Sequence, residues 1–209
     1  NIKATSTSAF RSAKNGNVIV NLINEKTKIK IDIIDGITEA KLIYHGVSKA
    51  VNLNEKPYLI MDIGGGSVEF IICNSDGILW LKSFEIGAQR LIETFHSQDP
   101  ISSDSVTHLS QYLNEQLKEL YSACAKWKPY ELLGASGSFD TLTDIYCAQK
   151  NITQNVADEL SFDLSVADTL QIIEDITKKD RLERLKTPGM TKIRVNMIVV
   201  ASLLIKKII

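Results

Sequence analysis

The stretch 58–73, which reads YLIMDIGGGSVEFIIC, constrains the fold more than any other part of the chain. Tyr58–Ile63 and Val68–Cys73 are runs of apolar and β-branched residues, and such runs predict two strands. The segment between them consists of Gly64, Gly65, Gly66 and Ser67. Small residues between two strands predict a tight hairpin, in which glycine tolerates a positive φ and lets a ligand approach the backbone closely.

Two acidic residues bracket this turn, Asp62 before it and Glu69 after it. Successive amide N–H groups in a turn can form a concave anion site. Carboxylates beside such a site suit a divalent cation that is bound together with phosphate. The pattern therefore predicts a phosphate and metal site, although an ordinary hairpin with two solvated acids would also produce it.

Size and composition limit the class of protein. The chain has 209 residues, enough for one large domain or two small ones, and its 44% hydrophobic and 23% charged residues are typical of a globular protein. The formal net charge is −1 and no dense Lys/Arg cluster exists, so no nucleic-acid surface is expected. The most apolar segment, Val195–Ile205, is too short to cross a bilayer and predicts a buried helix.

The three cysteines, Cys73, Cys124 and Cys147, are widely spaced and form no CxxC pair. This pattern argues against a disulfide framework or a zinc site and favours a reducing cytoplasm. The chain starts at Asn1 without a methionine and shows no signal peptide, so we expect a fragment of a longer protein.

Upstream of the hairpin the pattern alternates between short helices and a strand. Ser8–Ala13 predicts a short helix and Lys28–Ile34 a half-exposed strand. Thr38–Val51 has apolar residues at helical spacing, with Glu39 in its first turn. The polar segment Asn52–Pro57 predicts a linker between lobes.

Downstream, Ile78–Ile86 predicts a third strand, which would complete a β-meander. Tyr130–Leu133 predicts a short buried strand that leads through a Gly/Ser loop into the helix Phe139–Cys147. Because a helix N-terminus favours anions, this unit is a second candidate phosphate site, although a purely structural turn fits equally. Further helices are expected at Ala88–Phe95, Asp104–Lys126, Val166–Lys178, Asp180–Leu185 and Thr191–Ile209. The order of elements indicates an α/β fold.

Several segments together carry a resemblance that covers nearly the whole chain. In chain order they are ATSTSAFRSAKNG, IIDGITEAKLIYHG, DIGGGSVEF, EIGAQRLIETF, GASGSFDTL, and TPGM followed by IRVNMIVVASLLI. This succession resembles the exopolyphosphatase/guanosine pentaphosphate phosphohydrolase (Ppx/GppA) family. The resemblance implies an actin-like ATPase (ribonuclease H-like) fold with a mixed sheet and flanking helices. Residues 1–52 would be the C-terminal part of the first lobe and residues 57–209 the second lobe.

The resemblance also implies a function and a site. The family hydrolyses phosphoanhydride bonds of inorganic polyphosphate or guanosine pentaphosphate, with Mg²⁺ as the expected cofactor. Glu39 occupies the place of the catalytic base, while Asp62 and Glu69 would position metal or water. The phosphate ligands would be Arg11, Gly64, Gly65, Gly66, Ser67, Ser136, Gly137 and Ser138. A homodimer would be compatible with the exposed helices.

The chain departs from the family pattern at three places. A phosphate loop that normally precedes Asn1 and a Ser/Gly-rich strand that normally follows Ile209 are absent, and Asn196 stands where relatives usually have an acid. We therefore expect residues 1–209 not to catalyse alone. An ATP-binding kinase or ATPase lobe of the same superfamily, or a non-catalytic phosphate-binding module, are the alternatives. In a purely structural interpretation, Glu39 would be an acid that stabilises a helix start, and Arg11 would be a surface residue.

Overall fold

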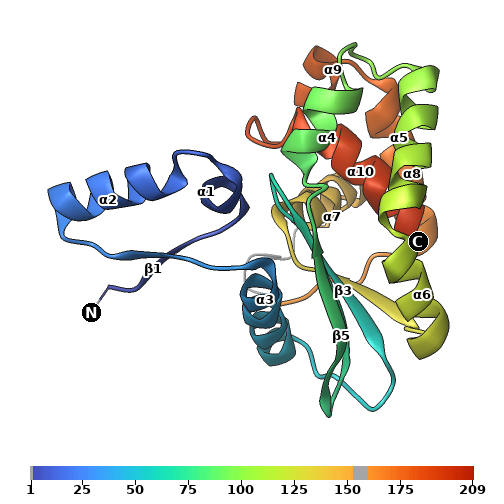
Figure 1. Cartoon of the computed structure of the whole chain (residues 1–209). Helices are drawn as coiled ribbons and strands as arrows, with labels where there is room; N and C mark the ends of the chain where they lie inside the picture. The colour runs from blue at the N-terminus through green and yellow to red at the C-terminus, as the bar shows by residue number, and fades with distance from the viewer. Residues whose placement is uncertain (1, 153–159) are drawn as a thin grey trace.

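The computed structural model describes residues 2–152 and 160–209, which form an N-terminal arm and a larger body (Figure 1). The elements of the arm are β1 (Ala4–Ser6), α1 (Ser8–Ser12), α2 (Gly16–Thr27) and β2 (Ile31–Ile33). β1 and β2 pair in parallel. The helix α3 (Gly36–Ala50) leads from the arm onto the body. The expected boundary between lobes, at residues 52–57, stays a prediction.

The body is built on a four-stranded sheet with the order β5-β4-β3-β6. Its strands are β3 (Tyr58–Ile63), β4 (Val68–Asn74), β5 (Gly77–Phe84) and β6 (Glu131–Gly134). The first three strands form the predicted antiparallel meander, and β6 runs parallel to β3 at one edge. Ile63 pairs with Val68, so the glycine turn connects β3 and β4 directly, as predicted.

Each face of this sheet packs on a different group of helices, because successive side chains of a strand point to opposite faces. Ile60 of β3 and Ile71 of β4 contact α3 through Ala40, Ile43 and their apolar neighbours. The core on the opposite face includes the helices α4 (Ala88–Phe95), α5 (Ser103–Gln116), α6 (Lys118–Trp127), α7 (Gly137–Lys150), α8 (Val166–Lys178) and α10 (Met197–Ile208). Within the described residues, the short helix α9 (Arg181–Leu185) contributes no residue to this core. α10 lies in the middle of this layer and is buried over most of its length.

Two predicted helices differ most from the observed ones. The single helix expected at Asp104–Lys126 is wrong, because the chain bends at Leu117. The bend directs α5 towards α4 and α10, and α6 towards β4 and β5. The terminal helix begins at Met197 rather than Thr191, and in the preceding segment the Val195 carbonyl oxygen accepts a hydrogen bond from Arg184 Nε at 3.0 Å. Among the residues described, no helix combines the length and apolar character needed to span a membrane.

Candidate functional site

Three carboxylates gather where α3 begins above the sheet. Asp62 on β3 and Glu69 on β4 are directly opposite each other, and Glu69 is opposite Ser83 on β5. Directly opposite residues share a face of the sheet, so the side chains of Asp62, Glu69 and Ser83 lie on the face that α3 covers. Glu39 in the first turn of α3 is close enough for its charge to raise the pKa of both acids on the strands.

The start of α3 is held against the sheet by two local features. Asp35 caps the helix, with its Oδ1 accepting a hydrogen bond from the Thr38 amide at 2.7 Å. The helix therefore begins at Gly36, two residues before the predicted start. A Cβ at Gly36 would lie 2.4 Å from the Ser83 Cβ, so only glycine permits this close approach. The approach places Glu39 next to the acids of the sheet.

The surroundings of Asp62 and Glu69 disfavour the charged forms of both side chains. Burial, together with the charge of Glu39, raises the pKa of Asp62 to about 6 and that of Glu69 to about 7. Ser83 Oγ donates to Glu69 Oε1 at 2.6 Å, which opposes this rise only in part. A bound proton or cation would relieve the repulsion among the three carboxylates.

Arg11 of α1 connects the arm to this group. Its Nη1 donates to the Ile34 carbonyl oxygen at 3.0 Å and to Glu39 Oε2 at 3.2 Å. The resemblance predicted an arginine that approaches a phosphate chain, and Arg11 lies beside the predicted base. The ion pair is shielded from solvent, since both side chains are less than one quarter exposed, at 22% and 18%.

The glycine turn supports the site by close packing. Positive φ values in the described residues are confined to other positions, so the expectation that the turn exploits such a conformation is wrong. Instead, the carbonyl oxygens of Gly64–Gly66 accept hydrogen bonds of 2.9–3.2 Å from the amides of Gly87–Gln89 at the start of α4. A Cβ at Gly66 would lie 2.4 Å from Ser8 Oγ, so α1 also packs on the turn. Ser67 is buried and its hydroxyl bonds to Glu69.

The second predicted phosphate loop lies at the start of α7. Ser136 is the N-cap, Ser138 is buried, and a Cβ at Gly137 would lie 2.2 Å from Arg194 Nη2. The guanidinium of Arg194 therefore covers this helix start, and its charge lowers the pKa of Asp62. Within the described ranges, the buried Oγ of Ser136 has no hydrogen-bond partner. Arg194 thus lies at the second loop and interacts electrostatically with Asp62, one of the three carboxylates.

Sequence reasoning missed Arg194, which precedes α10 by three residues. The signal available was a basic residue between the TPGM loop and the longest apolar run of the chain. By itself this signal does not distinguish a site residue from a solvated one. The contact of the Arg194 guanidinium with Gly137, seen only in the structure, makes this distinction.

The residues present are compatible with Mg²⁺. Residues 2–152 and 160–209 contain no group of three or more His, Cys, Asp or Glu side chains with metal-binding geometry. However, Mg²⁺ is commonly held by one or two carboxylates together with waters and substrate phosphates. Asp62 and Glu69 provide two such carboxylates on one face of the sheet. Their raised pKa values favour neutralisation by a cation.

A cavity of about 930 Å³ reaches the site at Asp62. It extends between α3, the edge strand β6 and α7, and it is lined by Val47, Leu133, Phe139 and Asp144 among others. Of the three carboxylates, that of Asp62 therefore lines a cavity that opens to solvent.

The fold is actin-like: it has a glycine turn between meander strands, a helix start that carries an acid over them, and a second strand–loop–helix unit. The chain belongs to the Ppx/GppA phosphatase family, whose family model matches residues 1–209. A crystal structure of an exopolyphosphatase from Cytophaga hutchinsonii is 41% identical and superposes with a TM-score of 0.96, covering 100% of this chain and 67% of that one.

Curated relatives carry two kinds of name. A bifunctional 3-dehydroquinate synthase/phosphatase from Fusobacterium nucleatum is 28% identical over 100% of this chain and 31% of its own length. A guanosine-5'-triphosphate,3'-diphosphate pyrophosphatase from Photobacterium profundum is 26% identical over 91% of this chain and 36% of its own length. The chain therefore spans about a third of the curated relatives that it matches.

Proposed function

We propose that this chain forms part of a phosphohydrolase that releases the terminal phosphate of inorganic polyphosphate or guanosine pentaphosphate. The observation that carries the proposal is the convergence of Glu39, Asp62 and Glu69 beside the glycine turn. Family membership and the names of the relatives support the same reaction class. Both substrates end in a phosphoanhydride bond, so one site can serve either.

Glu39 is the proposed general base. It would accept a proton from the water that attacks the terminal phosphorus. Arg11 lies 3.2 Å from Glu39 and would hold both the carboxylate and a phosphoryl oxygen in place. Phosphoryl transfer needs little covalent chemistry from a protein, so positioning and charge neutralisation would supply most of the rate enhancement.

Asp62 and Glu69 are the proposed ligands of Mg²⁺, which when bound neutralises charge that develops on the phosphoryl oxygens. Arg194 and the hydroxyl of Ser136 would bind phosphoryl oxygens from the α7 side. The glycine turn would contribute through its backbone, because its Ser67 hydroxyl already bonds to Glu69.

The test is phosphate release by the longer protein with Mg²⁺, measured on polyphosphate and guanosine pentaphosphate side by side. Glu39→Gln should lower the rate by about 10²- to 10⁴-fold on both substrates. The control is Glu25→Gln, which changes an acid of α2 on the arm and should leave the rate unchanged. Near-normal turnover by Glu39→Gln would remove Glu39 from its assigned role.

The remaining expectations are proposals of the same kind. Residues 1–209 alone should not release phosphate, the protein should be cytoplasmic, and its exposed helices are compatible with a homodimer. Thermal unfolding with polyphosphate, guanosine pentaphosphate and ATP distinguishes the hydrolase from an ATP-binding lobe, since a ligand raises the midpoint only where it binds the folded state. Stabilisation by ATP alone would favour the kinase or ATPase alternative.

A further inference from the structure

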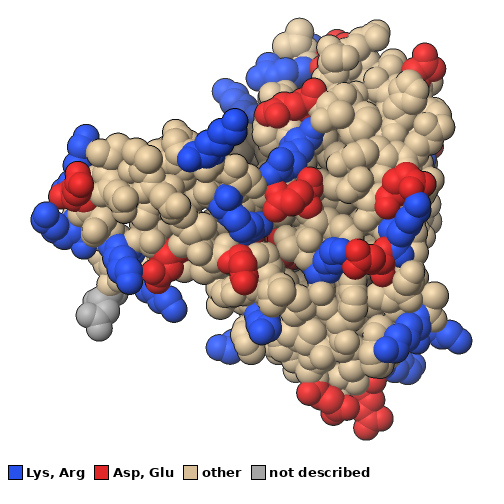
Figure 2. Space-filling view, viewed as in Figure 1, with Lys and Arg blue, Asp and Glu red and all other residues tan. Residues whose placement is uncertain are grey.

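The carboxylate of Glu85, between β5 and α4, is surrounded by four donors. Ser8 Oγ and Ser12 Oγ each lie 3.3 Å from its Oε2, Arg90 Nη2 lies 2.6 Å from Oε2, and Arg11 Nη2 lies 3.4 Å from Oε1. We call these five residues the Glu85 cluster. It joins α1 of the arm to the start of α4, and Figure 2 shows acidic and basic side chains next to each other along this junction.

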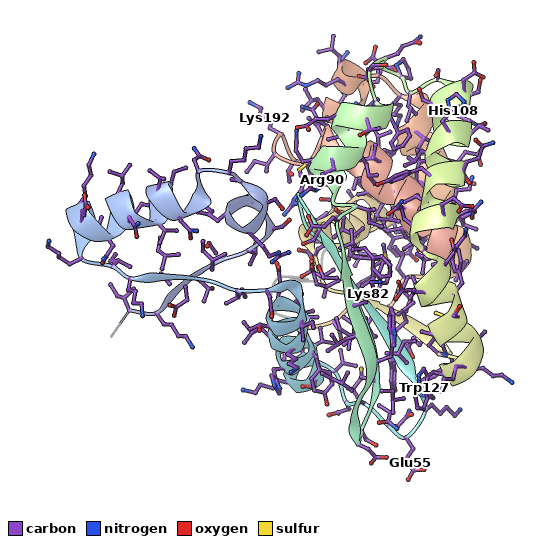
Figure 3. All side chains as sticks on the ribbon, in the orientation of Figure 1. Glu55, Lys82, Arg90, His108, Trp127 and Lys192 are labelled. Atoms are coloured by element: carbon purple, nitrogen blue, oxygen red, sulfur yellow. The ribbon has the colours of Figure 1, made fainter. Side chains whose placement is uncertain are left out.

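Both arginines of the cluster are also held by contacts that do not involve Glu85. Arg90 Nε donates to the Gly66 carbonyl oxygen at 2.8 Å, and its Nη2 donates to Ser12 Oγ at 2.9 Å. Arg11 is held by the Ile34 carbonyl oxygen. Figure 3 shows Arg90 where the arm meets α4. Each guanidinium group is therefore also anchored by a contact that does not involve the carboxylate they share.

Glu85 itself is the exchangeable member of the cluster. Its side chain is 50% exposed. Of its two arginine contacts only the one with Arg90 is short, at 2.6 Å, whereas the one with Arg11 is long for an ion pair, at 3.4 Å. Exposed ion pairs contribute little to stability, so a more highly charged anion can displace such a carboxylate.

The donor set suits a phosphoryl group. Two guanidinium groups and two hydroxyls that converge on one point form charge-assisted hydrogen bonds with oxyanions. The cluster is continuous with the proposed catalytic group, because Arg11 bonds to Glu39 as well as to Glu85. A single arginine therefore lies between the proposed base and the Glu85 cluster.

We propose that the Glu85 cluster is a second oxyanion site for the phosphate chain, and that Glu85 is an internal competitor that a phosphoryl group replaces. The inference deepens the proposed function and rests on it. Removing the negative charge of Glu85 then leaves two arginines available and strengthens the binding of polyanions. A purely structural clasp predicts the opposite, because its loss would loosen the arm and weaken binding.

The experiment measures the affinity of the chain for inorganic tripolyphosphate by calorimetry at low salt. Glu85→Gln should lower Kd about three- to tenfold, which matches the loss of weak, exposed competing ion pairs. The control is Glu119→Gln on α6, which removes an equal charge from an exposed pair with Lys82 and should leave Kd unchanged. Equal or weaker binding by Glu85→Gln, or equally tighter binding by both variants, would overturn the proposal.

A second variant covers the case in which Glu85→Gln does not fold. Ser12→Ala removes one donor and no charge, and should raise Kd about two- to fivefold, in line with one lost hydrogen bond. Unchanged binding by Ser12→Ala would contradict the site. Binding is measured here without turnover, whereas the proposed hydrolysis is judged by phosphate release. The failure of one proposal can therefore be distinguished from the failure of the other.

Discussion

Glu69→Gln should make the protein more stable at alkaline pH. Glu69 is buried, faces Glu39 and Asp62, and accepts a hydrogen bond from Ser83. Glutamine keeps the shape and an oxygen acceptor for Ser83 but carries no charge. The substitution therefore removes the repulsion and the desolvation cost, and retains most of the packing.

The magnitude follows from the pKa of Glu69, which burial raises from 4.5 to about 7. Because the folded-state pKa lies above the unfolded one, the stabilising contribution is fully present below about pH 4.5 and is lost as the pH rises through about 7. One pKa unit corresponds to about 1.4 kcal/mol, so ionised Glu69 costs about 3 kcal/mol of folding free energy. After allowance for a weaker hydrogen bond, Glu69→Gln should gain about 2 kcal/mol at about pH 8 and almost nothing at about pH 4.5.

The assay is urea unfolding without divalent cations, followed by the fluorescence of Trp80 and Trp127 at the two pH values. Glu93→Gln is the control, since Glu93 is exposed on α4 and bonds only to Gln89 among the hydrogen bonds found. It should change the free energy of unfolding by less than about 0.5 kcal/mol at either pH. An equal effect of Glu69→Gln at both pH values, or a loss of stability at the higher one, would refute the electrostatic reasoning.

Three further predictions concern other parts of the site. Gly87→Ala should lower the free energy of unfolding by about 1–3 kcal/mol, because its Cβ would lie 2.4–2.5 Å from backbone atoms of the glycine turn. The control is Gly46→Ala, whose Cβ would have nothing within 4 Å. In the same urea experiment this control should be neutral or gain up to about 1 kcal/mol. Arg194→Met should raise the pKa of Asp62 further and move the acid limb of the pH–rate profile of the longer protein to higher pH; an unchanged limb would contradict this. Removal of Mg²⁺ with a chelator should stop phosphate release and added Mg²⁺ should restore it, whereas activity that survives chelation would exclude the proposed metal role.

The meander and several helices could be predicted because their signals are local. The observed bounds of β3, α4 and α8 are those expected from apolar periodicity and flanking residues. The errors arose where a distant side chain decides the boundary. Arg184 bonds to the segment just before α10, and α5 and α6 contact different partners on either side of the bend at Leu117.

In the candidate site, too, local features could be predicted from the sequence and distant contacts could not. A four-residue turn that pairs Ile63 with Val68 necessarily places Asp62 opposite Glu69, so the pairing of these acids could have been counted from the sequence. The approach of Glu39 needed the close contact of Gly36 with Ser83, and Arg194 comes from a loop far along the chain. No local pattern encodes such contacts. The chemical roles of all these residues stay predictions.

The edge strand β6 has a practical consequence for the handling of this chain. Within the described part of the structure, β6 pairs only with β3, so its outer row of backbone amides and carbonyls can accept a strand from another molecule. Leu132 and Leu133 are only partly buried there, while the exposed Glu131 places a negative charge at the start of the strand. Two copies that align side by side would bring these charges together. Salt that screens this repulsion should therefore favour association through β6, and light scattering should rise with ionic strength.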